Sequence, residues 1–205
     1  MKYILRPFLL YSMVLLILGS FCQMVKAQIG ASPTPMRVIA TSSLPAAPKV
    51  GDTAPDFKLP YATQEKIFMK PEDQLSLSSL RGKAVILAFY PADFSGGCTT
   101  EVCTLRDSFA DLGKLNATVL GISGDYVFSH QEWAKKHNLP FALASDHNHA
   151  VAKQYDSYNE AFGFNKRTVF LIDKTGVIRY LNLDFKATDK AGYDALKAEL
   201  EKLNK

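Results

Sequence analysis

The apolar positions of the chain form two unbroken runs in its central part. Residues 84–90 (AVILAFY) are apolar throughout and are bounded by Gly82 and Pro91, and residues 117–122 (ATVLGI) form the second run. Runs of this length between turn-forming residues are typical of strands that are buried on both faces. We therefore predict two buried strands, the first of which lies in the interior of a sheet.

Other segments show the spacing of a helix with one apolar face. Apolar residues recur in this way over residues 99–112, with Gly113 as a stop signal, and again over residues 193–203. Residues 129–132 (SHQE) have the form of a capping box, which predicts a helix running to about His137. The pattern thus predicts three helices, one of them directly after the first buried strand.

Shorter signals complete the order of elements. Residues 141–144 are read as a short strand, residues 150–155 as a helical turn, and residues 169–172 and 177–181 as a hairpin. Strands that alternate with helices and end in a hairpin and a helix are typical of α/β folds. We predict a thioredoxin-like, three-layer α/β sandwich with a central mixed sheet.

The N-terminus has the pattern of a targeting segment. Two basic residues precede the uncharged apolar run 8–22, which is shorter than the roughly 20 residues of a membrane span. Val25 and Ala27 then provide the small residues that a signal peptidase recognises. We predict a signal peptide over residues 1–27 and an exported protein, periplasmic or secreted, without stable membrane insertion after cleavage. An uncleaved membrane anchor is the alternative.

Composition divides the remaining chain into a linker and one domain. Residues 28–48 are rich in Ala, Ser, Thr and Pro and contain no acidic residue, which predicts a flexible linker. Residues 49–205 have the length of one ordinary domain. The 205 residues are 47% apolar, with 24 basic and 20 acidic side chains, so the net charge of +4 is modest. This composition is globular and gives no indication of a nucleic-acid partner.

The chemistry concentrates where the first buried strand ends. Cys98 follows Gly96 and Gly97 at the predicted change from strand to helix. A cysteine there lies near unpaired backbone N–H groups and the positive end of the helix dipole, which favour the reactive thiolate. Ser95 offers a hydroxyl group three residues earlier. Taken from the residues alone, Cys98 is either a nucleophile or an inert buried thiol.

This segment resembles a known active-site motif. Pro91-x-x-x-Ser95-x-x-Cys98 is similar to the Pro-x-x-x-Thr/Ser-x-x-Cys motif of the peroxiredoxins, and the spacing to Cys103 is similar to that of their bacterioferritin-comigratory-protein subclass. The resemblance implies that Cys98 reduces hydrogen peroxide and organic hydroperoxides and becomes a sulfenic acid. It also implies that Arg167 stabilises the thiolate and polarises the peroxide, and that a thioredoxin-like or other thiol reductant recycles the enzyme.

Physical chemistry supports these roles. A peroxide needs an aligned nucleophile and hydrogen-bond donors on the oxygen that leaves, which Cys98, Ser95 and Arg167 would provide together. Pro91 has no N–H group, and we expect it to shield the sulfur from water and bulky oxidants. No cofactor is expected, and the enzyme is predicted to be a monomer or a homodimer.

Cys103 is the candidate partner for an oxidised Cys98. Cys22, the third cysteine, belongs to the predicted leader, which leaves an even pair. Positions five apart on a helix lie roughly 140° apart around its axis, whereas a disulfide needs Cα atoms within about 7 Å. The helix start must therefore unwind for the two sulfurs to join. The alternative is that Cys103 is a helix thiol without a redox role.

Three other interpretations were weighed. An exported thiol-disulfide oxidoreductase shares the fold, but it would be expected to contain Cys-x-x-Cys, which this sequence lacks. A non-catalytic binding module on the same fold would have no need of Cys98, Ser95 and Arg167, all of which are present. Residues 146–149 (DHNH) could suggest a metal site, but they are more typical of a polar turn before a helix, so no metal is predicted.

Overall fold

The structure is a computed structural model that describes residues 46–204 of the chain. The predicted signal peptide, its cleavage site and nearly all of the predicted linker lie outside these residues. Within residues 46–204, no helix has both the length and the apolar character that crossing a membrane would require.

A seven-stranded mixed sheet forms the centre of the fold. Its strand order is β11-β10-β5-β6-β7-β2-β3, in which the β5–β6 and β6–β7 pairs are parallel and the other pairs antiparallel. The strands are β2 (Tyr61–Ala62), β3 (Ile67–Phe68), β5 (Ala84–Phe89), β6 (Ala117–Ser123), β7 (Ala142–Ser145), β10 (Thr168–Ile172) and β11 (Ile178–Asn182). The two apolar runs thus form neighbouring interior strands.

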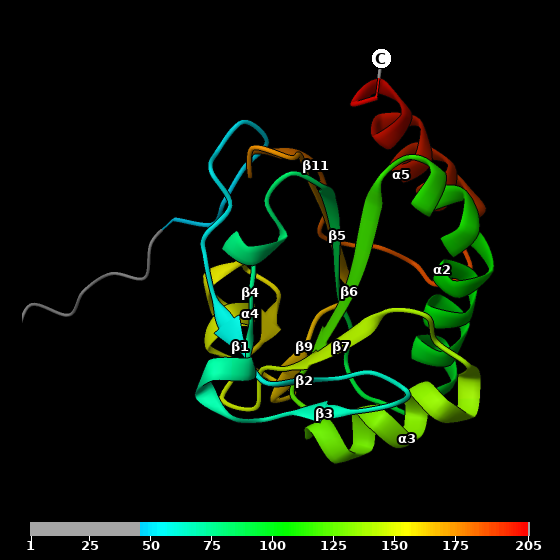
Figure 1. Ribbon diagram of the computed structural model, residues 1–205. Coiled ribbons are helices and arrows are strands. Elements are labelled where there is room, and N and C mark those ends of the chain that lie inside the picture. The colour runs from blue at the N-terminus through cyan, green and yellow to red at the C-terminus, as the bar shows by residue number, and fades with distance from the viewer. Residues whose placement is uncertain (1–45, 205) are drawn as a thin grey trace, which may run out of the picture. The chain divides into compact units, whose positions relative to one another are not determined.

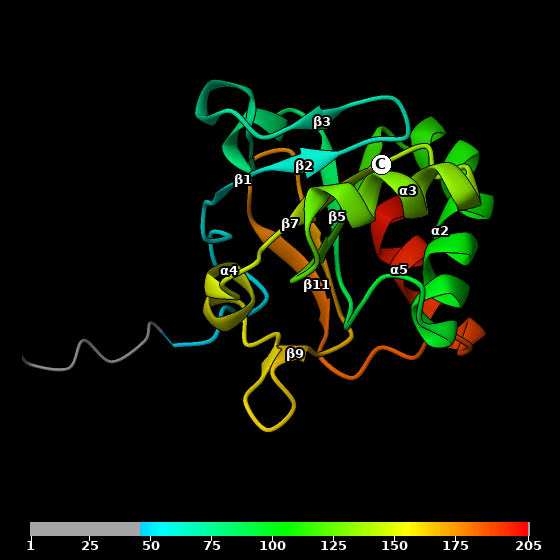
Figure 2. The same cartoon turned by 90° about the horizontal axis from the view of Figure 1, so that it is seen from below.

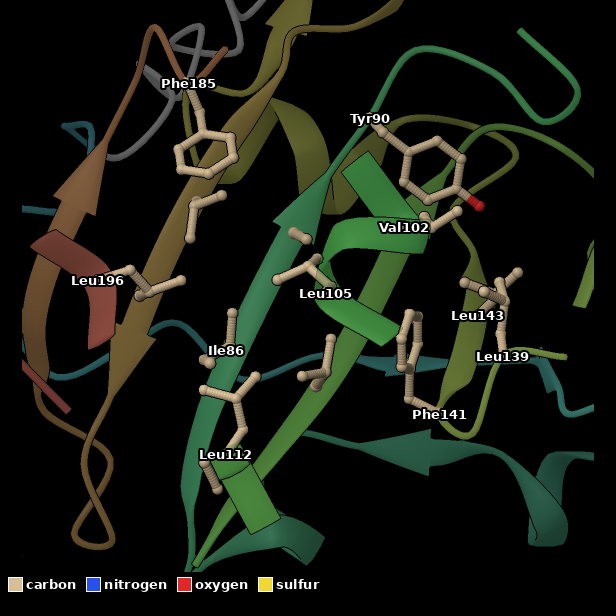
Figure 3. Packing of buried hydrophobic residues seen from close by; sticks show 14 of the residues in the cluster. Ile86, Tyr90, Val102, Leu105, Leu112, Leu139, Phe141, Leu143, Phe185 and Leu196 are labelled. Carbon is tan, nitrogen blue, oxygen red and sulfur yellow. The ribbon is translucent and has the colours of Figure 1, made fainter. Parts of the chain in front are cut away.

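Two apolar layers cover the sheet because side chains of a strand alternate between its faces. Along β5, Ile86 points into a cluster with residues of α2 (Gly96–Lys114) and α5 (Lys190–Lys202), whereas Leu87 points into a cluster with α4 (Ala150–Gln154). Figures 1 and 2 show α2 and α5 on one side of the sheet and α4 on the other. Figure 3 shows the first cluster, in which Ile86, Val102, Leu105 and Leu196 pack together. The predicted three-layer α/β sandwich is confirmed.

Helix boundaries differ from the sequence prediction in two places. α2 begins at Gly96 rather than at residue 99, which places Cys98 inside the helix. The capping-box prediction was wrong: α3 (Val127–His137) begins before Ser129, and the Ser129 hydroxyl donates to the Asp93 carboxylate instead of capping a helix. Ser129 does not cap the helix because its hydroxyl group is used in a tertiary hydrogen bond with a buried carboxylate.

The hairpin β10–β11 and the short strand β7 are confirmed, and α5 begins three residues earlier than predicted. Several two-residue elements have too little periodicity to be predicted. They are β1 (Lys58–Leu59), β4 (Leu75–Ser76), β8 (Tyr158–Asn159) and β9 (Phe164–Asn165), with the short 3₁₀ helices η1 (Pro71–Asp73) and η2 (Ser78–Leu80).

The end of β5, the start of α2 and the start of β10 lie at the same end of the sheet. α2 starts just beyond the carboxyl end of β5, and the antiparallel register pairs Thr168 at the start of β10 with Phe89 at the end of β5. The residue before β10, Arg167, therefore lies beside the start of α2.

Candidate active site

Cys98 lies in the first turn of α2 and is completely buried. The helix is already formed there, because the Thr99 N–H group donates to the Ser95 carbonyl over 2.9 Å. The sulfur thus stands near the positive end of the helix dipole, where negative charge is stabilised.

Arg167 reaches this sulfur from the neighbouring strand. Its Nη2 atom lies 3.4 Å from Cys98 Sγ, and its side chain is only 18% exposed. A guanidinium group is a fixed positive charge that donates through several N–H groups, so in this position it stabilises a thiolate. The structure therefore brings together Cys98 and Arg167, which are 69 residues apart in sequence.

Glu101 is the third member of the cluster, and the sequence analysis assigned it no role. It is fully buried one turn after Cys98 and accepts a hydrogen bond from Arg167 Nη1, while its Oε1 atom has no hydrogen-bond partner within residues 46–204. Burial raises the pKa of Glu101 to about 7, although the charge of Arg167 acts in the opposite direction. The i, i+3 spacing from Cys98 was the sequence signal that both side chains share a helix face.

Burial also acts on Arg167, where it favours loss of the charge. Its two acidic partners outweigh this effect, with Glu101 the larger influence and Cys98 the second, so the pKa of Arg167 is raised. The guanidinium therefore stays charged throughout the physiological pH range.

Gly97 allows the guanidinium to approach α2. A Cβ atom at this position would lie 3.1 Å from Arg167 Nη2, whereas a Cβ at Gly96 would meet no atom within 4 Å. Of the two glycines before Cys98, Gly97 is the one that the Arg167 contact requires.

Ser95 and Pro91, two further predicted site residues, precede α2, and Ser95 bonds to a residue other than Cys98. The Ser95 hydroxyl donates to the Ala92 carbonyl over 3.0 Å, so its hydrogen is engaged there rather than with Cys98. Ser95 is the N-cap residue of α2, but its side chain makes no capping hydrogen bond. Pro91 lies two residues after the end of β5 and is partly exposed.

Cys103 lies in the second turn of the same continuous helix and is partly exposed, and both thiols are free. Because α2 is unbroken from residue 96 to residue 114, the two cysteines project from different sides of the helix. The structure therefore does not bring Cys98 and Cys103 together.

A buried polar network holds the loop before Cys98. Asp93 accepts hydrogen bonds from Tyr90 (2.8 Å) and Ser129 (2.7 Å), and its Oδ2 atom lies 2.8 Å from His130 Nδ1. Its backbone N–H group donates to Asp125 over 2.8 Å. These bonds tie the loop to β5, α3 and the end of β6, so the position of the loop is fixed by several elements.

The segment 146–149 is a polar turn, as predicted. The Asp146 carboxylate accepts from the N–H groups of Val151 and Ala152 at the start of α4, while His147 contacts Tyr126. No group of three or more potential metal ligands occurs in the described part of the chain.

Comparison with known proteins places this site in context. The family model described as "AhpC/TSA family" matches residues 50–181. A putative peroxiredoxin bcp of Coxiella burnetii is 46% identical over 136 residues, which are 63% of this chain and 85% of that protein. Peroxiredoxin Bcp of Bacillus subtilis is 37% identical over 134 residues, 62% of this chain and 80% of that protein.

The matches extend to longer proteins and to solved structures. The chloroplastic peroxiredoxin Q of Triticum aestivum is 44% identical over 108 residues, 52% of this chain, and the match spans half of its length. Peroxidoxin BcpB from Mycobacterium tuberculosis superposes with a TM-score of 0.65 at 30% identity, covering 76% of this chain and 98% of that one. AhpC from Enterococcus faecalis gives a TM-score of 0.67 at 24% identity, covering 76% and 92%, and supports the fold.

The role of Gly97 can be tested by the substitution Gly97→Ala, with Gly96→Ala as the matched control. The new methyl group of Gly97→Ala displaces the guanidinium from Cys98 Sγ, so we expect alkylation of Cys98 at pH 7 to slow about three- to tenfold. Peptide mass spectrometry after timed iodoacetamide treatment measures this rate. Both substitutions change helix propensity equally. Equal rates in the two variants would contradict the assignment.

The raised pKa of Glu101 predicts a dependence of stability on pH. Below its ordinary pKa of 4.5, Glu101 is neutral in both the folded and the unfolded chain; between 4.5 and about 7 only the unfolded chain ionises. We expect the free energy of unfolding of the wild type to fall relative to that of Glu101→Gln as pH rises through this window, and the difference to level off above it. Urea unfolding from pH 4 to pH 8 measures this, with the exposed Glu132→Gln as control. Parallel curves for wild type and Glu101→Gln would disprove it.

Proposed function

The chain belongs to the AhpC/TSA family and is a thiol peroxidase, and on this basis we propose that Cys98 is the residue that peroxide oxidises. The observation that carries the proposal is the contact of one partly buried guanidinium, that of Arg167, with both Cys98 Sγ and the Glu101 carboxylate. The proposed substrates of the protein are hydrogen peroxide and organic hydroperoxides.

The first step is a nucleophilic attack on the peroxide. The Cys98 thiolate attacks one peroxide oxygen, the O–O bond breaks, and the sulfur becomes a sulfenic acid while water or an alcohol leaves with a proton from solvent. Arg167 stabilises the thiolate before the attack and donates to the leaving oxygen during it, which is the most effective use of a fixed charge in a buried site. Gly97 allows that approach.

The second step joins the sulfenic acid to Cys103. The Cys103 sulfur displaces the hydroxyl group from Cys98, which gives a disulfide and water. Since the two residues face different sides of α2, the first turn of the helix must open. That turn is weak: it contains Gly96 and Gly97, has no acidic residue, and lacks a side-chain cap because Ser95 bonds to Ala92 instead.

A thiol reductant completes the cycle by reducing the Cys98–Cys103 disulfide. Opening of the helix start moves this disulfide out of the buried pocket, where a second protein can attack it. A thioredoxin-like protein is the chemical class of reductant that this arrangement requires.

Peroxide consumption by the reduced protein tests the proposal. We expect Cys98→Ser to abolish the fast reaction seen by stopped flow, leaving a rate no greater than that of free cysteine. We expect Cys103→Ser to react once with peroxide at the wild-type rate and to accumulate the sulfenic acid, detected by dimedone trapping.

Peptide mass spectrometry of the peroxide-treated wild type should show a Cys98–Cys103 disulfide. Its absence would remove Cys103 from the mechanism, and undiminished activity of Cys98→Ser would refute the assignment of Cys98.

A further inference from the structure

A histidine from another helix lies against the second thiol. Cys103 Sγ is 3.7 Å from Nδ1 of His137, the last residue of α3. Both side chains are partly buried, so the contact lies in the seam between α2 and α3. The peroxide-reactive cluster around Cys98 does not include this pair.

The contact is anchored by Arg106, one turn after Cys103. Its Nη1 atom donates to the His137 carbonyl over 2.8 Å, and its other nitrogens pair with Asp107. Trp133 packs edge to face against the His137 ring, with the ring centroids 6.0 Å apart. The imidazole is thus positioned by groups on both helices.

The charges near His137 favour its neutral form. Burial first, and then the positive charges of Lys136 on α3 and Arg106 on α2, lower the pKa of His137 from its ordinary value of 6.5. Asp107, the neighbour of Arg106 on α2, is paired with Arg106. At pH 7 the ring therefore has one nitrogen free to accept a proton. We assign its own proton to Nε2, because this leaves Nδ1 as the acceptor for the Cys103 thiol.

We propose that His137 is the general base that deprotonates Cys103 for its attack on the Cys98 sulfenic acid; this rests on the role of Cys103 in the proposed function. The proton passes from Cys103 Sγ to His137 Nδ1, and the sulfur electron pair forms the S–S bond as the S–O bond of the sulfenic acid breaks. The leaving hydroxide takes up the proton from the imidazolium. One sulfenic acid and one thiol thus give one disulfide and one water, and His137 returns to its neutral form.

The turn of α2 that carries Cys103 is held more firmly than the turn that carries Cys98. Arg106 is bonded to the end of α3, and Leu105 is buried in the apolar cluster, so the turn that carries Cys103 is held in place. The turn that carries Cys98 is uncapped and contains two glycines. The Cys98 segment therefore moves to Cys103, and the contact between Cys103 and His137 survives until the attack.

The substitution His137→Asn tests the inference, because asparagine keeps a polar side chain but is not basic. Single-turnover stopped flow separates sulfenic acid formation from disulfide formation. We expect the first rate to be unchanged and the second to fall about tenfold or more at pH 7. His147→Asn is the matched control, because this histidine is exposed and contacts Tyr126 rather than either cysteine.

The pH profile of disulfide formation gives a readout that a merely structural role would not move. In the wild type, the rate should be nearly constant from pH 7 to pH 8 and should fall as His137 becomes protonated below pH 6.5. In His137→Asn, the rate should instead rise steadily over the same pH range, because hydroxide rather than a histidine then removes the thiol proton. Fluorescence of Trp133, the single tryptophan, reports the titration of the adjacent ring.

The outcomes separate this inference from the function on which it rests. If the wild type forms no Cys98–Cys103 disulfide, the proposed second step itself is wrong, and the role of His137 falls with it. If the disulfide forms and His137→Asn matches the wild type in rate and pH profile, only the role of His137 is overturned. Should the variant fold poorly, the wild-type profile decides, because a rate that climbs steadily from pH 7 to pH 8 contradicts a histidine base whose pKa lies below 6.5.

Discussion

The candidate active site is organised by one partly buried positive charge that is shared between two acids. Arg167 comes from the strand edge, while Cys98 and Glu101 come from one face of α2. If both acids ionise, the cluster is left with a net negative charge in a buried place, which is costly. If one ionises, the charges balance. Glu101 and Cys98 therefore share a single counterion, the Arg167 guanidinium. Protonation of Glu101 near neutral pH leaves the guanidinium available to the sulfur.

The same guanidinium depends on the fold around it. It is positioned by the register between β10 and β5, by Gly97, where a methyl group would press on Arg167 Nη2, and by a buried glutamate. The loop before Cys98 is fixed from behind by the Asp93 network, which links it to α3. The end of α2 that carries Cys98 is thus surrounded by several contacts, although its own first turn is weak.

The sequence was informative where a signal was long or where a motif combined several residues. The apolar runs of β5 and β6 predicted two interior strands, and the motif from Pro91 to Cys98 pointed to the site. Contacts between distant elements could not be predicted. Nothing in the local sequence places His137 beside Cys103, and the burial of Glu101 against Arg167 comes from packing between elements that are distant in the sequence. Ser129 was misread for the same reason: its hydroxyl group bonds to a carboxylate 36 residues away.

The weak start of α2 also bears on how the enzyme survives excess oxidant. A sulfenic acid that remains inside the helix can meet a second peroxide molecule and become a sulfinic acid, which disulfide chemistry cannot reverse. In the proposed mechanism, how long it remains there depends on the opening of the first turn, which two glycines and the lack of a side-chain cap make less costly. Resistance to inactivation is therefore set by the conformational preference of a few backbone bonds, a property that can vary while every reacting group stays the same.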